Sequence, residues 1–157
     1  MECNPRATAG NRLKPVTYAA DDGFQFGTTW FFDHERETQC YLQSTHDGTL
    51  RCLPRLRSDQ ASAVPAYFAD AACTRAATSV SPCREDRYVV VAYPEAPEDV
   101  CSATVTRVYE LAAQVAPAYI LDTGGACVEH AEDGDWVFRE LGAEVPIETF
   151  VAFTSSR

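Results

Sequence analysis

The sequence predicts an all-β fold: repeated β-hairpin units that form a small barrel, sandwich or propeller-like array, stapled by disulfides. Asp-Gly turns flanked by aromatic or β-branched residues are the first observation, because they are the strongest short-range signal of a hairpin. They are Asp22-Gly23, Asp47-Gly48 and Asp133-Gly134. A second observation is a threefold recurrence in which an aromatic-led stretch reaches an Asp and then a Cys. It comprises Phe31-Phe32-Asp33 with Cys40, Tyr67-Phe68-Ala69-Asp70 with Cys73, and Tyr119-Ile120-Leu121-Asp122 with Cys127.

The first part of the chain reads as a β-meander. We expect strands at residues 24–33, 39–45 and 50–53, joined by a turn at 34–37 and by the Asp47-Gly48 turn. Residues 54–64 lack alternation and predict a connector. The apolar run at residues 88–93 has the length of a buried strand and is far too short to cross a bilayer.

Two pairs of segments resemble each other. Residues 65–68 match 117–120, and residues 110–115 match 140–145 at an offset of 30. Such matches predict hairpin units laid side by side. Residues 105–115 also fit helical spacing, but the second copy contains Gly142 and is followed by Pro146, which suits a strand better.

The length of 157 residues predicts a single domain. We expect an N-terminal arm at residues 1–15, a first hairpin group at 16–92, a connecting loop at 93–99 and a second hairpin group at 100–157.

Charge narrows the range of partners. Thirteen basic against 23 acidic residues give a net charge of −10, and the basic residues are scattered. A nucleic-acid backbone would be repelled, and an anionic membrane surface is disfavoured as well. The partners that remain include a protein or a glycan. We expect no cofactor and no metal, because no Cys-x-x-Cys pair is present and the three His stand at no ligand spacing.

Seven cysteines favour an exported protein, in the periplasm, on the outer surface or outside the cell, because a reducing cytosol would leave them as free thiols. The first residues lack the pattern of a secretory leader, so a leader or a lipid anchor is expected upstream of this sequence. The expected pairs each span a predicted turn, although spacing alone does not fix connectivity. They are Cys40 with Cys52, Cys73 with Cys83, and Cys101 with Cys127, which leaves Cys3 over.

Five stretches together resemble a family of secreted or lipoprotein domains of unknown function that is common in social soil bacteria. They are residues 10–15, Trp30-Phe31-Phe32-Asp33, residues 47–54, residues 67–73 and residues 141–146. The resemblance implies export and disulfides, and it brings no catalytic residues.

Candidate ligand-binding residues cluster around the two Trp, because an exposed Trp beside Asp or Arg is a common design of sugar sites and protein hot spots. The set is Trp30, Asp33, Arg36, Trp136 and Arg139. The competing interpretation places both Trp in the core. The recurring Asp residues suit turns that accept backbone amides better than a Ca²⁺ site.

We therefore expect an exported, non-catalytic surface or periplasmic module that binds a protein or a glycan. A purely structural envelope or spacer domain is the alternative, and it predicts that both Trp are buried. A second alternative is a secreted hydrolase with a dispersed site around His34 or His130. That site would need a carboxylate and a nucleophile beside one His.

Overall fold

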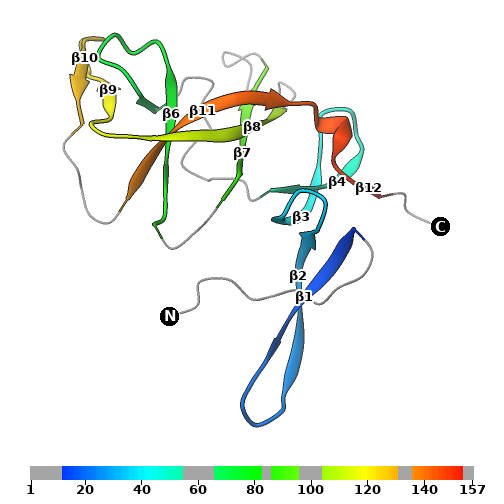
Figure 1. The fold of residues 1–157 in the computed structure, drawn as a ribbon. Helices are drawn as coiled ribbons and strands as arrows, with labels where there is room; N and C mark the ends of the chain where they lie inside the picture. Colours follow the sequence, from blue (N-terminus) through cyan, green and yellow to red (C-terminus); the bar gives the residue numbers. More distant parts are fainter. Residues whose placement is uncertain (1–11, 55–65, 83–85, 96–103, 131–135, 154–157) are drawn as a thin grey trace.

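The structure is a computed structural model that describes residues 12–54, 66–82, 86–95, 104–130 and 136–153. Within these residues, twelve β-strands form two antiparallel sheets, accompanied by one short 3₁₀ helix, η2 (Ile147–Thr149). Figure 1 shows the two sheets joined at the middle of the molecule. The prediction of an all-β fold held by disulfides is confirmed.

The smaller sheet begins with the predicted meander and has the strand order β1-β2-β3-β4-β12. The strands observed for the three expected segments differ from the prediction by at most one residue at each end. The bounds in this sheet are β1 (Leu13–Ala19), β2 (Gln25–Asp33), β3 (Thr38–Ser44), β4 (Leu50–Pro54) and β12 (Ala152–Phe153).

The larger sheet has the order β10-β9-β5-β6-β11-β8-β7. Its strands are β5 (Tyr67–Phe68), β6 (Ala76–Val80), β7 (Tyr88–Pro94), β8 (Thr104–Val115), β9 (Tyr119–Leu121), β10 (Cys127–Glu129) and β11 (Val137–Val145). The segment with helical spacing is therefore a strand, β8. The segments that match in sequence lie in neighbouring strands, since β8 pairs with β11 and β5 pairs with β9.

Three hairpin loops share one geometry, in which the third and last loop residue is a Gly with positive φ. Gly23, Gly48 and Gly125 have φ of +89°, +76° and +80°. Each loop is closed by a backbone bond between the residues that flank it, as from Thr45 N–H to Thr49 O at 3.0 Å. Residues with a Cβ rarely adopt this left-handed conformation, which explains the Gly. The turns predicted at Asp22-Gly23 and Asp47-Gly48 are confirmed, and Asp133-Gly134 lies outside the described residues.

The Cys40–Cys52 disulfide is confirmed, with Cα atoms 5.3 Å apart. A two-residue turn at Asp47-Gly48 would have placed Cys52 opposite Gln43. The three-residue loop shifts the register by one, so Cys52 lies opposite Leu42 and Cys40 opposite Pro54. The bond therefore runs diagonally between β3 and β4.

The predicted pairs Cys73–Cys83 and Cys101–Cys127 are wrong, because Cys73 bonds to Cys127. These cysteines are 54 residues apart. Cys73 lies in the turn between β5 and β6 and Cys127 begins β10, and the larger sheet brings their Cα atoms to 5.7 Å. The second and third copies of the aromatic–Asp–Cys pattern are thus bonded to each other. Cys3, Cys83 and Cys101 lie outside the described residues.

One core cluster joins the two sheets. Leu53 on β4 packs with residues of the larger sheet and with the segment that follows it, and the cluster comprises Leu53, Tyr88, Val90, Val108, Ile147 and Phe150. The sheets do not follow the predicted hairpin groups, since β5, β6 and β7 belong to the larger sheet and the C-terminal β12 returns to the smaller one. That the chain is a single domain stays a prediction.

Replacing Leu53 by Ala should lower the free energy of unfolding by about 3 kcal/mol, because the side chain is fully buried where the sheets meet. Urea unfolding measures the change. Leu42→Ala on the adjacent strand is the matched control, since this side chain is 38% exposed, and it should cost less than about 1 kcal/mol. Equal losses from the two substitutions would contradict the placement of the core.

Candidate functional site

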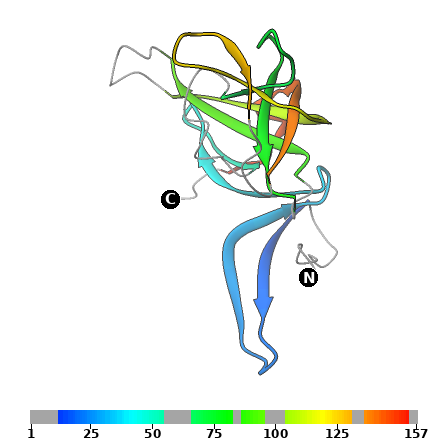
Figure 2. The same cartoon turned by 90° about the vertical axis from the view of Figure 1, so that its left-hand side faces the viewer.

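The hairpin of β1 and β2 projects from the molecule. β3 pairs with β2 only over Trp30–Asp33, whereas β1 pairs with β2 as far as Ala19 and Gln25. Among the described strands, the outer part of β2 therefore has β1 as its one partner. Figures 1 and 2 show this hairpin leaving the body in two perpendicular views.

Exposed aromatic side chains lie on the outer part of the hairpin. Phe24, directly after the loop, is 64% exposed, and Tyr18 on β1 is 39% exposed. Asp21 and Asp22 in the loop are exposed as well. The carboxylate of Asp22 accepts the backbone N–H of Phe24 at 2.9 Å, which fixes the turn that presents the ring. We call Tyr18, Asp21, Asp22 and Phe24 the hairpin tip.

At its root, the hairpin is closed by Arg12 and Asp33. Arg12 precedes β1, and its guanidinium donates to both carboxylate oxygens of Asp33, the last residue of β2, at 3.1–3.2 Å. A backbone hydrogen bond joins the same two segments, since His34 N–H donates to Arg12 O at 2.8 Å. Asp33 is fully buried and also accepts the N–H groups of Glu35 and Arg36. The hydrogen bonds to Asp33 raise the pKa of Arg12.

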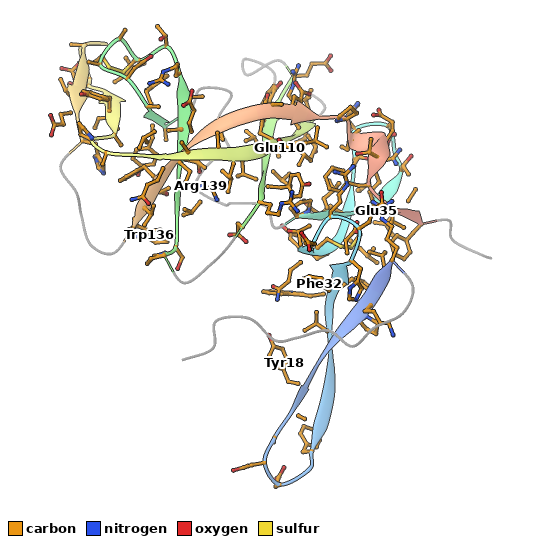
Figure 3. The ribbon with its side chains drawn as sticks, in the orientation of Figure 1. Tyr18, Phe32, Glu35, Glu110, Trp136 and Arg139 are labelled. Carbon is orange, nitrogen blue, oxygen red and sulfur yellow. A yellow bond between two sulfur atoms is a disulfide. The ribbon has the colours of Figure 1, made fainter. Side chains whose placement is uncertain are left out.

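The same root is tied to the core of the molecule. Arg12 also donates to Thr149 O at 3.0 Å, at the end of η2. Arg36 donates to the hydroxyl of Thr149, and its guanidinium lies over the ring of Phe150, 4.5 Å from the centroid. Phe150 is buried in the cluster that joins the sheets. The hairpin is therefore held at one end, while its tip stays exposed to solvent (Figure 3).

Three of the five predicted ligand-binding residues, Asp33, Arg36 and Arg139, make side-chain hydrogen bonds within the protein. Asp33 and Arg36 belong to the root of the hairpin. Arg139 on β11 donates to three backbone carbonyls, those of Leu111, Ala112 and Asp86, at 2.7–2.9 Å. The register of β8 and β11 shifts beside Arg139, so its guanidinium satisfies carbonyls at an irregular point of the sheet.

The two Trp lie on different sheets. Trp30 is partly buried on β2, opposite Tyr41 of β3. Trp136 lies next to the start of β11 and is 51% exposed. Figure 3 shows Trp136 and Arg139 on the side of the larger sheet, away from Phe32 and Glu35. The structure does not bring the five predicted residues together in one site.

A model of a family of unknown function, DUF7481, matches residues 2–153. The chain belongs to this family. No curated protein and no solved structure matches it. The DUF7481 match brings no assigned activity, so the function rests on the chemistry of the described residues.

His34 and His130 of this DUF7481 chain make aromatic contacts. His34 lies edge-on to Phe32 at 5.0 Å between centroids, and His130 lies edge-on to Tyr67 and Phe138 at 5.2 and 5.5 Å. Among the described residues, no hydrogen bond joins either ring to a carboxylate. The same part of the chain contains no group of three or more metal-ligating side chains and no helix able to span a membrane.

The recurring Asp residues act as turn residues, as the sequence indicated. Asp33 accepts the N–H of Glu35, Asp70 that of Thr74, and Asp122 those of Gly124 and Ala126. Thr74 donates to Asp70 through both its hydroxyl and its N–H, and with Arg75 it lowers the pKa of Asp70 to about 2. The sequence patterns do not identify Arg12, Phe24 or Tyr18 as functional residues. The signal that could have found them is a predicted strand at residues 24–33 that is longer than the next predicted strand, at residues 39–45.

Replacing Asp33 by Ala should lower the free energy of unfolding by about 3 kcal/mol, because Arg12 and two backbone N–H groups lose a buried acceptor. Chemical denaturation measures it. Arg107→Ala, which removes an ion pair with Glu144 in which both side chains are more than 40% exposed, is the control and should stay within about 0.5 kcal/mol of the wild type. A D33A protein as stable as this control would show that the root is not fixed as described.

Asp70→Asn should destabilise the protein in a pH-dependent way. The pKa of Asp70 is lower in the folded chain than in the unfolded chain, so its carboxylate stabilises the fold above about pH 4. This contribution is lost as the pH falls towards 2. The difference in stability between wild type and D70N should therefore shrink from pH 5 to pH 2 in thermal unfolding. A difference that stays constant over this range would contradict the assignment.

Proposed function

We propose that the protein is an exported, non-catalytic module that binds another protein through the tip of its projecting hairpin. The exposure of Phe24 and Tyr18, on a hairpin that the described contacts hold at its root, is the observation that carries this proposal. Export is supported by the two disulfides, since such bonds form and persist in oxidising compartments.

The low stability of an isolated two-stranded hairpin in water supports a binding role for this one. A two-stranded hairpin in water is marginally stable, and large exposed aromatic side chains add little to it. The protein nevertheless uses the contact of Arg12 with the buried Asp33, and the stacking of Arg36 on Phe150, to hold its root. A protein surface that covers Phe24 and Tyr18 would bury the apolar area that the hairpin leaves exposed.

The alternatives have weaker support. A spacer domain predicts that both Trp are buried, and Trp136 is half exposed. A glycan site needs free polar groups beside a Trp, but Asp33 and Arg139 are bonded within the chain. A hydrolase needs a His beside a carboxylate and a nucleophile, and the described contacts of His34 and His130 are aromatic.

Phe24→Ser tests the proposal. Immobilised wild-type protein should retain a partner from an envelope extract of the source organism, and F24S should retain at least about tenfold less, because a central aromatic anchor dominates binding. Mass spectrometry of the eluate measures the ratio. The stability of F24S should stay within about 0.5 kcal/mol of the wild type, since the ring is exposed.

Leu121→Ser is the matched control, because Leu121 is a 44% exposed apolar residue at the end of β9 in the other sheet. L121S should retain the partner like the wild type. Equal retention by F24S and the wild type would contradict the proposal. Retention that is lost on adding free oligosaccharides, with F24S unaffected, would instead support a glycan site elsewhere.

A further inference from the structure

We propose that the surface recognised by the hairpin tip is basic, a protein surface that carries clustered Arg and Lys side chains. This inference rests on the proposed function and adds the chemistry of the partner. Three features of the chain support it: the charges of the tip, the aromatic rings beside them, and the way the chain already holds one of its own Arg side chains.

The hairpin has negative charge and no positive charge beyond its root. Residues 15–34 contain three Asp and no Lys or Arg. One of these, Asp33, is neutralised by Arg12 at the root. Asp21 and Asp22 are the remaining two, both exposed in the loop. The tip therefore presents two carboxylates, and Figure 2 shows that the loop of this hairpin lies away from the body.

Two other Asp residues in turns have a basic neighbour, whereas the described contacts of Asp122 are with backbone N–H groups. Asp47 pairs with Arg51 at 3.0 Å, and Asp70 pairs with Arg75 at 3.3 Å. Within the described part of the chain, no ion pair involves Asp21 or Asp22. A basic partner would supply at the tip the positive charge that the Asp47 and Asp70 turns receive from their own chain.

The aromatic residues of the tip favour the same partner. A guanidinium or ammonium group binds well over an aromatic face, and more strongly when water is excluded. The chain shows the arrangement internally, where Arg36 lies over Phe150 and within 5.8 Å of the centroid of Tyr88. Phe24 offers an exposed ring in the turn that Asp22 fixes, so one Arg of a partner can contact this ring and a carboxylate together.

The net charge of the molecule also favours a basic partner. At −10, the protein attracts basic surfaces over a distance of about 10 Å at 0.1 M salt and repels acidic ones. This general attraction does not select a site. The test must therefore separate binding at the tip from binding anywhere on an acidic protein.

Two synthetic peptides of equal length serve as probes, with Arg at alternate positions in one and Glu in the other, and Leu and Ser between. Each is titrated into the ¹⁵N-labelled full chain. The Arg peptide should shift the amide signals of residues 18–24 first, and its affinity should fall at least about tenfold between 50 and 500 mM NaCl. The Glu peptide should shift none of them.

Asp21→Asn/Asp22→Asn should weaken the Arg peptide about tenfold, while the side-chain amide oxygen introduced at position 22 still accepts the N–H of Phe24. Glu95→Gln/Glu129→Gln is the control, because it removes two exposed charges away from the hairpin. This control should change the affinity less than twofold. Equal weakening by both double variants would show attraction to the whole molecule and overturn the inference.

Two further outcomes also overturn it. Equal shifts of residues 18–24 with both peptides would show that charge does not select the partner. No shift with either peptide would show that the tip does not bind basic chains. In both cases retention that depends on Phe24, as measured in the envelope extract, would still support the proposed function, so the two failures are distinguishable.

Discussion

The contact between Arg12 and Asp33 is the constraint on which the projecting hairpin depends. It joins the residue before β1 to the last residue of β2, at the end of the hairpin where β3 also pairs with β2. The carboxylate is fully buried and has a partner for each of its oxygens, which is the condition under which a buried charge is tolerated. Through Thr149 the same guanidinium reaches the core that joins the sheets.

This arrangement separates the molecule into a stable body and an exposed arm. The body has a diagonal disulfide between β3 and β4, a second disulfide between the β5–β6 turn and β10, and a core shared by both sheets. The arm has two strands, a turn fixed by Asp22, and rings that are exposed to solvent. Neither Phe24 nor Tyr18 belongs to a described core cluster, so these two positions are free to serve recognition.

Local features of the fold were predictable from the sequence, and non-local ones were not. Asp-Gly pairs and alternation located β2, β3 and β4 and the Cys40–Cys52 bond, because a hairpin is determined by neighbouring residues. The Cys73–Cys127 bond depends on the order of strands in the larger sheet, which the spacing of cysteines in the sequence does not encode.

The candidate site likewise depends on contacts between residues that are distant in the sequence, and these were not predictable. Arg36 and Arg139 were predicted to bind a ligand, but they contact groups of the protein itself that are distant in the sequence. The hairpin projects because β2 extends beyond its pairing with β3. Its root is held by Arg12, which is 21 positions from Asp33 in the sequence.

A photo-crosslinking scan tests the central claim most directly. A benzophenone amino acid is placed at Ala20 or Phe24 on the arm, and at Leu42 or Leu121 on the body, all of them exposed. After illumination in the envelope extract, protein adducts should form from the two arm positions and be absent from the two body positions. Adducts from Leu42 or Leu121, with none from Ala20 or Phe24, would contradict the account.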